Sequence, residues 1–335
     1  MKKVNRQILW TLAFCALFVP AIVQASAGGN GNGQGNGHGG GGGRGGGGGG
    51  AASAPVIAFV NGGWFGELVV MDADGGNKTQ LTDFLISRPT WSPDASEIVF
   101  EGYANSGLPG GLGVYAIAPD GSGMRQIATK QGLPTSGAAW SPVPTVDGTS
   151  RIAFCDTLPG DSGGSLFLVR PDGSDVLRLT FDAGDKYPSW SPDGTRIAVQ
   201  RAADIQIIEL SAATGSLGIA SSTSLGVSMN VAAPQWSKTS DLIAFGASPL
   251  GGGESDIWTI DAQSGFTNNV TNDPVISFMA PSFSADDTQI VMASNASGHR
   301  LTIHVVDATG GNLQNLGGGG RLGRGHHNHP TWKNP

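Results

Sequence analysis

The chain has 335 residues, of which 55 are glycine and only 13% carry a charge, and its formal net charge is −7 at pH 7. An acidic chain is a poor ligand for nucleic acid or for an anionic membrane surface, because both repel negative charge. We therefore expect no nucleic-acid partner.

The first 27 residues have the pattern of an export signal. Three basic residues fall within the first six positions, residues 8–23 are almost continuously apolar, and Ala25-Ser26-Ala27 offers a cleavage site. We predict that residues 1–27 are a signal peptide and that the mature protein is periplasmic or secreted. The alternative is an uncleaved anchor helix, which the short apolar run and Pro20 within it disfavour.

Cleavage would remove three positive charges and no negative ones, so the net charge would fall to −10. Only Cys155 would remain of the two cysteines, so no intrachain disulfide could form and stability would come from packing. We interpret Cys155 as a small apolar residue of a strand and not as a reactive thiol. We also expect a monomer that binds no cofactor and does not insert into a membrane.

Residues 28–54 are predicted to be a glycine-rich flexible linker. From residue 28 to residue 50 there are 17 glycines in 23 positions, interspersed with Asn, Gln, His38 and Arg44. Such a tract has no apolar side chains to bury, so it cannot form a core of its own.

A repeated segment organises the rest of the chain. Its clearest copy is YPSWSPDGTRIAVQ at 187–200, and each copy carries one anchor aromatic. The gaps between successive anchors are 49, 50, 46, 47 and 49 residues. A period of this length with several β-rich runs is typical of radial arrays of four-stranded blades. The anchors are Trp91, Trp140, Trp190, Trp236, Phe283 and Trp332.

Each repeat contains four predicted strands. A short first strand begins three residues before the anchor aromatic and ends at it. The turn Ser191-Pro192-Asp193-Gly194 follows, because Pro fixes φ and Asp-Gly accepts the positive φ of a tight hairpin. The second strand, as at 197–199, is apolar throughout, which is expected where neighbouring blades cover both faces. A third strand, as at 205–208, and a weaker fourth strand complete the repeat.

The two ends of this domain are complementary. Residues 56–60, 68–71 and 79–82 supply a second, third and fourth strand without a first, whereas residues 329–332 supply only a first strand. We predict that the C-terminal strand joins the N-terminal blade and closes the ring. The predicted fold of residues 55–335 is therefore all-β, a six-bladed β-propeller of four-stranded antiparallel blades. An open solenoid does not account for the complementary ends.

The pattern P-x-W-S-P-D-G-x-x-I-A-F, followed by I-W-x-x-x-x-x-x-G-x-x-x-x-L-T, resembles the WD40-like propeller repeats of the TolB type over residues 55–335. TolB-type proteins are periplasmic components of the Tol-Pal envelope system and carry an α/β domain ahead of a six-bladed propeller. Here the glycine tract stands in place of that domain. The resemblance implies an exported, non-catalytic binding or scaffold module with an envelope protein as its partner.

Two short motifs suggest catalysis or metal binding without completing it. The segment Gly160–Ser165 matches the nucleophile loop of chymotrypsin-like proteases, but no His general base lies between His38 and His299. Asp72 and Asp74 look like the first half of a calcium loop that lacks its distal Glu. We interpret both segments as loops and assign no catalytic residue.

A histidine cluster lies near the C-terminus, at His326, His327 and His329. Imidazoles at this density can hold Zn²⁺ or Cu²⁺. The glycine-rich sequence around them offers no acidic or thiol ligand, so we assign no metal and leave metal binding by this cluster as an open alternative.

The residues three positions before the anchors are expected to surround one mouth of the central channel. They are Arg88, Gly137, Tyr187, Ala233, Ala280 and His329. Of these, Arg88, Tyr187 and His329 have usable chemistry, and they form our hypothesised binding site. The alternative function is a periplasmic polysaccharide lyase or another carbohydrate-binding propeller, which would need several His or Lys side chains in the channel.

Connection lengths predict which face binds. All but one of the WSPDG-type turns are short, as are the Asp/Gly turns between third and fourth strands. The connections on the opposite face vary in length and composition, and variable loops on a rigid scaffold are where binding usually resides. That face also holds the mouth with Arg88, Tyr187 and His329. Its long connections are 101–112, 155–165, 246–255, 295–300 and 317–328.

Overall fold

The computed structural model describes residues 56–62, 65–102, 111–132, 137–212, 216–295, 301–317 and 327–334, without the side chains of residues 327 and 328. These residues form strands joined by turns and bends. Within them no helix has the length and apolar character needed to cross a membrane. The predicted signal peptide and glycine-rich linker lie outside the described residues and remain predictions.

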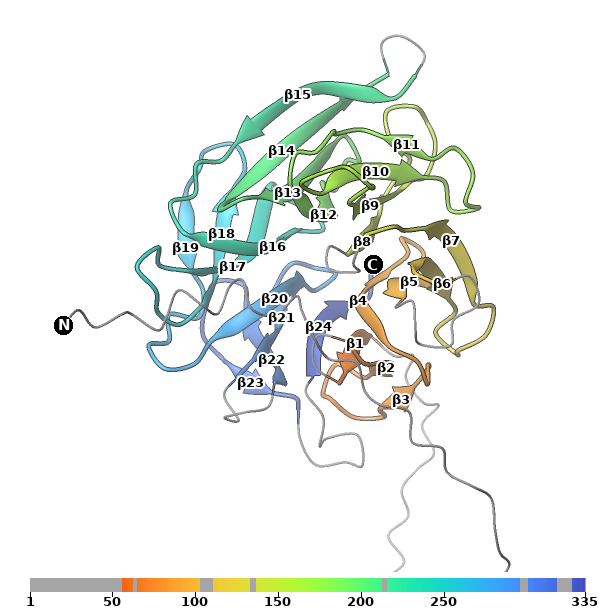
Figure 1. The fold of residues 1–335 in the computed structure, drawn as a ribbon. Coiled ribbons are helices and arrows are strands. Elements are labelled where there is room, and N and C mark those ends of the chain that lie inside the picture. Colours follow the sequence, from red (N-terminus) through yellow and green to blue (C-terminus); the bar gives the residue numbers. More distant parts are fainter. Residues whose placement is uncertain are drawn as a thin grey trace, which may run out of the picture. The chain divides into compact units, whose positions relative to one another are not determined.

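Six four-stranded antiparallel sheets surround a common axis, as the sequence predicts (Figure 1). Blades 1 to 3 consist of β24 (His327–Trp332), β1 (Ile57–Asn61), β2 (Glu67–Met71) and β3 (Thr79–Gln80); β4 (Ile86–Trp91), β5 (Ile98–Gly102), β6 (Gly113–Ile117) and β7 (Arg125–Thr129); and β8 (Ala138–Trp140), β9 (Ile152–Asp156), β10 (Ser165–Val169) and β11 (Leu177–Arg178). Blades 4 to 6 consist of β12 (Asp185–Trp190), β13 (Arg196–Arg201), β14 (Asp204–Ser211) and β15 (Gly218–Ser224); β16 (Asn230–Trp236), β17 (Leu242–Ser248), β18 (Asp256–Asp261) and β19 (Thr267–Asn269); and β20 (Phe278–Phe283), β21 (Gln289–Ser294), β22 (Thr302–Asp307) and β23 (Gln314–Asn315).

The ring is closed by the C-terminal strand. β24 pairs antiparallel with β1, with Ile57 opposite Trp332 and Ala58 opposite Thr331. The backbone N–H of Lys333 extends the pairing by donating to the carbonyl of Val56 at 2.7 Å. The predicted closure is therefore confirmed, and the first strand of blade 1 comes from the opposite end of the chain.

The apolar core consists of six clusters, each between two adjacent blades. Trp91, for example, is 1% exposed and packs among Ala58, Val60 and Leu68 of blade 1 as well as residues of its own blade. Burial of such a side chain from both sides stabilises the seam between blades. Each cluster has one anchor aromatic at its centre or edge, namely Trp91, Trp140, Trp190, Trp236, Phe283 and Trp332.

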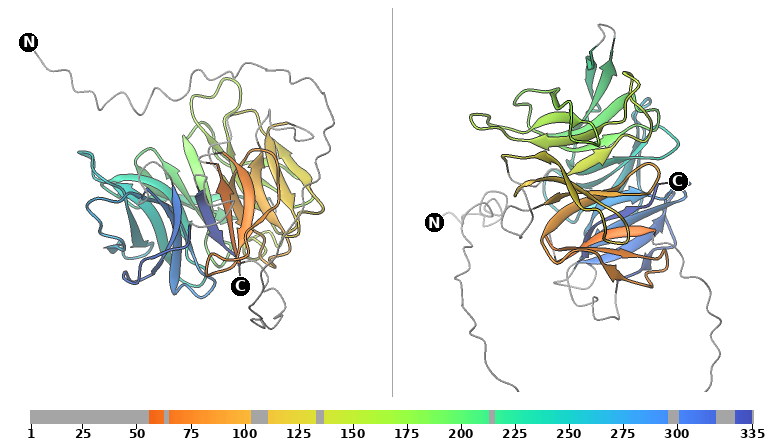
Figure 2. Two further views of the ribbon diagram at one scale, coloured as in Figure 1. Left: turned by 90° about the horizontal axis from the view of Figure 1, so that it is seen from below. Right: turned by 90° about the vertical axis from the view of Figure 1, so that its right-hand side faces the viewer.

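The connections between strands define two faces of the disc (Figure 2). We call the face with the first-to-second and third-to-fourth turns the hairpin face, and the other the loop face. On the hairpin face, the carboxylate of Asp193 accepts hydrogen bonds from the hydroxyl of Ser191 at 2.6 Å and from the N–H and hydroxyl of Thr195 at 3.1 and 2.8 Å. The same Ser/Thr-Asp-Ser/Thr bonding fixes the turns at Asp94, Asp147 and Asp286.

The first strands differ from the sequence prediction in where they begin. β4, β12, β16, β20 and β24 begin five or six residues before the anchor, and only β8 starts close to the predicted position. The prediction missed a bulge, which shifts the register between Lys186 and Ser189 in β12 and at equivalent places in four other blades. A bulge inserts one unpaired residue and re-aims its side chain. The residue three before the anchor lies in the bulge in these five blades, whereas in blade 3 the equivalent residue, Gly137, directly precedes β8.

Candidate functional site at the two ends of the channel

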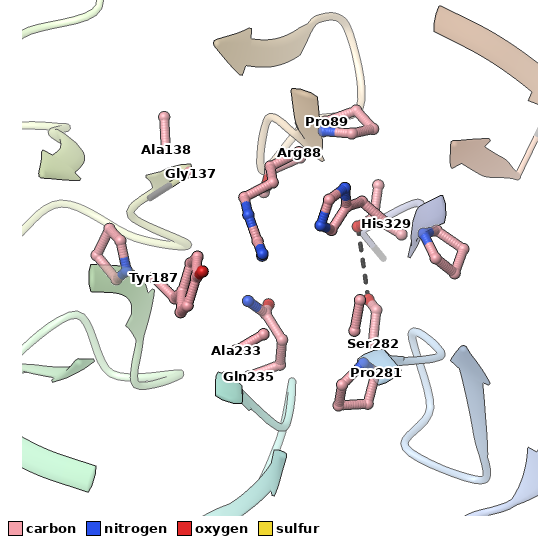
Figure 3. A pocket seen from close by; sticks show the side chains of 15 residues that line it. Arg88, Pro89, Gly137, Ala138, Tyr187, Ala233, Gln235, Pro281, Ser282 and His329 are labelled. Carbon is pink, nitrogen blue, oxygen red and sulfur yellow. Dashed lines mark hydrogen bonds between the residues drawn. The ribbon is translucent and has the colours of Figure 1, made fainter. Parts of the chain in front are cut away.

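The six residues predicted to surround a channel mouth all line one cavity on the axis (Figure 3). We call this the narrow end; its volume is about 40 Å³. All six have positive φ, with values of 50° for Arg88, 56° for Tyr187 and 50° for His329. Non-glycine residues rarely adopt this conformation. Here it places one residue per blade at the axis, and so gathers residues that are about fifty positions apart in sequence.

Arg88 and Tyr187 contact each other across the narrow end. The Cζ atom of Arg88 lies 3.8 Å from the centroid of the Tyr187 ring, although the two residues belong to blades 2 and 4. Gly137 of blade 3 lies between them and leaves the path open, because a Cβ atom there would be 3.1 Å from Cδ of Arg88. The narrow end is therefore largely filled by a cation–π pair that spans three blades.

The Arg88 guanidinium lies in a charged environment that the sequence did not reveal. Burial lowers the pKa of Arg88, and Tyr187 and the negative charge of Glu101 partly offset this. Glu101 is fully buried and forms an ion pair with Lys130, which is buried as well. Arg is protonated at any physiological pH. Glu101 therefore pairs directly with the Lys130 cation and attracts the Arg88 cation electrostatically.

His329 completes the polar set of the narrow end and is 5% exposed. Burial, and then repulsion by the Arg88 charge, holds the pKa of His329 well below its ordinary value of 6.5. The imidazole is therefore neutral at neutral pH. Figure 3 shows it beside Pro89, on the side of Arg88 away from Tyr187.

Three polar residues near the narrow end were missed by the sequence analysis: Glu101, Lys130 and Gln235. Glu101 directly follows the apolar run 98–100 of a strand that is covered on both faces, and a charge at such a position was an available signal. Gln235 directly precedes the anchor Trp236, and its amide points toward Arg88 (Figure 3). Lys130 follows β7, and its pairing with Glu101 depends on a contact between two strands that no spacing rule reveals.

A second cavity, which we call the wide end, opens on the hairpin face and has a volume of about 320 Å³. It shares only Thr90 and Gln235 with the narrow end, so these two residues lie at the partition of the channel. Five of the residues two positions after the anchors line it: Pro93, Pro142, Pro192, Lys238 and Asn334. No feature of the repeat pattern predicts this cavity.

Within the part of the chain that the structure describes, no histidine lies beside the protease-like motif. The hydroxyl of Ser162 donates to the carboxylate of Asp182 at 2.9 Å, and Asp182 also accepts the N–H of Gly163. The two histidine side chains that the structure describes lie elsewhere, since His304 contacts Ser294 within blade 6 and His329 lines the narrow end. Residues 160–164 form a loop, as predicted, and Ser165 begins β10.

The metal-binding candidates are not supported where the structure describes them. Asp72 accepts a hydrogen bond from the amide of Asn77 at 2.7 Å and Asp74 one from the N–H of Gly76 at 2.8 Å, as in an ordinary hairpin turn. His326 and the side chain of His327 lie outside the described residues. Among the described residues, no group of three or more His, Cys, Asp or Glu could hold a metal ion.

Comparisons with known proteins give a fold relationship. No family model matches the sequence, and no curated protein matches it. The structure is similar to TolB from Acinetobacter baumannii, with a TM-score of 0.63 at 21% identity over 84% of this chain and 67% of that chain. It is also similar to a putative TolB from Agrobacterium tumefaciens, with a TM-score of 0.58 at 17% identity over 78% of this chain and 88% of that chain.

The same fold also occurs in an enzyme. A chain of the hydrazine synthase of Kuenenia stuttgartiensis matches with a TM-score of 0.60 at 12% identity, over 83% of this chain and 46% of that chain. Differently named proteins match about equally well. The structural similarity therefore establishes the fold, and the function has to be argued from the site itself. By its fold, residues 56–334 form a TolB-like six-bladed β-propeller.

Proposed function

We propose that this chain is an exported, non-catalytic propeller that binds an envelope protein on its loop face, over the narrow end of the channel. The observation that carries the proposal is the filling of the narrow end by Arg88 and Tyr187. A cavity of about 40 Å³ has room for about three water molecules, whereas small-molecule sites have volumes of roughly 300–1,000 Å³. A partner at this end therefore binds over the rim, as a protein surface does.

The chemistry of the rim suits protein recognition. Arg and Tyr are enriched at the energetic centres of protein interfaces, because they combine a large contact area with directional polar groups. Arg88 and Tyr187 are held in place before binding by their mutual stacking, which reduces the entropy lost on association. His329, neutral and buried, adds no second charge to this rim.

The loops around the narrow end also favour the loop face as the protein-binding surface. Exposed apolar side chains occur on the loop face at Leu85, Phe181, Leu250 and Val275, and Phe181 and Val275 are 73% and 75% exposed. The hairpin face has exposed apolar residues too, such as Phe266 at 73%. Hydrophobicity alone therefore does not choose between the faces. The choice rests on the variable loops and on the rim residues.

The predicted signal peptide and the two TolB neighbours in the fold comparison support export and an envelope location. The competing function is that of a carbohydrate-binding or polysaccharide lyase propeller. In its favour, Arg88, Tyr187 and His329 do converge, and a neutral imidazole beside a guanidinium could take a proton near a bound carboxylate. Against it, the closed narrow end gives a sugar ring no room beside these groups.

An affinity capture with tagged protein and envelope extract of the source cell tests the proposal. The informative variant is Arg88→Ala/Tyr187→Ala/His329→Ala, and a loop-face variant, Leu250→Ser/Val275→Ser, leaves the buried residues untouched. The matched control is Phe266→Ser on the hairpin face. We expect both loop-face variants to capture at least about ten-fold less of a specific protein than the wild type, whereas the control captures as much. The reason is that hot-spot residues contribute about 2 kcal/mol or more to the binding free energy.

Equal capture by all variants would place the interface elsewhere and contradict the proposal. Melting curves of each variant distinguish lost binding from lost folding. Incubation of the wild type with a uronic-acid polysaccharide tests the competing function, because a lyase would generate unsaturated ends that absorb in the ultraviolet. Such a product, absent with the triple variant, would favour the lyase.

A further inference from the structure

Blade 5 departs from the repeat at its hairpin turn. Where blades 2, 3 and 4 have Pro93, Pro142 and Pro192 two residues after the anchor, blade 5 has Lys238. Unlike a proline, Lys238 has a backbone N–H, which donates to the carboxylate of Asp287 in blade 6 at 2.7 Å. The turn is thus fixed to its neighbour by its backbone, and the lysine side chain is left to line the wide end of the channel.

The wide end is large enough for a small organic molecule. Its volume of about 320 Å³ falls within the range of roughly 300–1,000 Å³ found for small-molecule sites. Its apolar walls consist of three prolines, Ala139, Val143 and three tryptophans, and the other lining residues besides Lys238 are the uncharged polar residues Thr90, Ser189, Gln235, Ser237 and Asn334. The indole N–H of Trp190 is already bonded to the carbonyl of Ala139 at 3.0 Å, so this wall offers contact area and not a donor.

Among the described residues that line the wide end, Lys238 is the only charged one and none carries a carboxylate. The nearby Asp287 carboxylate is occupied by the N–H of Lys238 and by the N–H and hydroxyl of Thr239, at 2.7, 2.9 and 2.6 Å. Among the described residues, the Lys238 ammonium group has no hydrogen-bond or ion-pair partner. Burial lowers its pKa to about 8, and Asp287 partly offsets this. At neutral pH the group is therefore mostly a cation without a fixed counter-ion.

We propose that the wide end is a binding site for a small organic carboxylate with a flat apolar body, in which Lys238 pairs with the carboxylate and the proline and tryptophan walls contact the body. A charge-assisted hydrogen bond from a partly desolvated ammonium is stronger than a neutral one. A single lysine suits one carboxylate better than a phosphate, which is usually held by several donors. The site lies on the face opposite the proposed protein interface, and the two proposals stand independently.

Phenylacetate is a suitable probe, and phenylacetamide is its neutral counterpart of nearly the same shape. Isothermal titration calorimetry with the full chain should show saturable one-to-one binding of phenylacetate, and phenylacetamide should bind at least about ten-fold more weakly, a factor that corresponds to 1.4 kcal/mol. Lys238→Met should weaken the binding of phenylacetate to the level of phenylacetamide and leave the affinity for phenylacetamide unchanged. Lys238→Arg should retain a preference for the acid.

The matched control is Lys186→Met, which removes an exposed lysine of β12 away from the wide end and should leave both titrations unchanged. Val143→Trp, which fills the cavity from a partly exposed position, should abolish binding of both probes while the melting temperature stays close to that of the wild type. The proposal is overturned if phenylacetate shows no saturable binding up to about 10 mM, a Kd far weaker than that of specific small-ligand sites. It is overturned as well if Lys238→Met binds phenylacetate as tightly as the wild type, or if acid and amide bind alike.

Discussion

The two ends of the channel lie at opposite ends of the first strands of the blades and differ in the residues that line them. At the narrow end, the ring of residues three positions before the anchors contains Arg88, Tyr187 and His329, whose long side chains meet across the axis. At the wide end, three of the five lining residues that follow an anchor by two positions are prolines, whose short rings leave the axis open. The cavity that remains at the narrow end therefore has a volume of about 40 Å³, whereas the cavity at the wide end has a volume of about 320 Å³.

The difference shows that the residues that hold the blades together are distinct from the residues that line the two cavities. The anchor aromatics lie between these two rings and fix the blades, so residues at either ring can change without altering the seams. The two rings also differ in backbone strain. Every residue of the narrow ring has positive φ, whereas on the hairpin face positive φ falls mostly on turn glycines such as Gly148 and Gly194.

The largest effect is expected from removal of the strand that contributes to both ends. Deletion of residues 330–335 removes Trp332 and half of β24, together with Asn334, whose amide donates to the carbonyls of Trp91 and Ser92. We expect aggregation, or a melting temperature lower by at least about 10 °C, because several kcal/mol of inter-blade packing are lost. Differential scanning calorimetry measures this, with Lys333→Ala as the control; an unchanged melting temperature would argue against a closed ring.

The second prediction concerns the wall of the wide end. Trp190 is 5% exposed and packs between blades 3 and 4. Trp190→Ala should lower the free energy of unfolding by ~3–5 kcal/mol, because it leaves a cavity and removes the bond to Ala139. Trp140→Ala should cost less, since Trp140 is partly exposed. Urea unfolding followed by circular dichroism gives both values, and a loss below about 1 kcal/mol for Trp190→Ala would contradict the seam assignment.

The third prediction is a pH dependence that originates at the narrow end. The pKa of His329 is held well below 6.5 in the folded state by burial and by Arg88. Between the folded pKa and about 6.5 the unfolded chain binds the extra proton. The contribution of His329 to stability is therefore complete above pH 6.5 and declines below it, by up to about 1.4 kcal/mol per pH unit. His304, whose pKa is also lowered by burial, acts in the same direction.

Unfolding free energies measured between pH 5 and 8 test this for the wild type, His329→Gln and His304→Gln. Each substitution should flatten the decline below pH 6.5. The turn carboxylates act in a different window: hydrogen bonds from Ser284 and Thr288 lower the pKa of Asp286 to about 2, so its contribution is lost only at more acidic pH. If the wild type and His329→Gln declined in parallel, the imidazole would be titrating normally.

The repeat spacing was enough to predict the fold and the narrow ring. Aromatic residues at nearly equal intervals imply equivalent positions in successive blades, so a residue three before Trp190 and one three before Trp332 must lie at the same height on the axis. The complementary terminal strands predicted closure for the same reason. These inferences need only the symmetry of the backbone and no knowledge of individual side chains.

The remaining features of the site depend on side-chain contacts that symmetry does not determine. Arg88 reaches Tyr187 because Gly137 has no side chain, and the pairing of Glu101 with Lys130 depends on how two strands of blade 2 end. The bulge at Tyr187 was missed because alternation along the strand gives no sign of an inserted residue. The wide end was missed because its volume is set by what proline and Lys238 leave unfilled.

The fourth prediction measures the contact that closes the narrow end. A double-mutant cycle of Arg88→Met and Tyr187→Leu should give a coupling free energy of about 1–2 kcal/mol, because the guanidinium is partly desolvated where it lies over the ring. Urea unfolding of the four proteins provides the cycle. A coupling below about 0.3 kcal/mol, which is within the range of additivity for independent sites, would show that the two side chains do not stabilise each other in solution.

The smallest effect is expected from the backbone of the narrow ring. Ala280 and Gly137 occupy the same position of their blades and have φ values of 52° and 75°. Ala280→Gly should raise the free energy of unfolding by about 0.5–1 kcal/mol, because glycine adopts this conformation without steric cost, a gain that its unfolded-state entropy only partly offsets. Gly137→Ala should lower it by about 1 kcal/mol or more, since the new Cβ would also lie 3.1 Å from Cδ of Arg88. Opposite signs for the two variants would establish that the narrow ring is strained by its backbone and not by its particular side chains, while a destabilising Ala280→Gly would show that the alanine methyl group contributes more than its backbone costs.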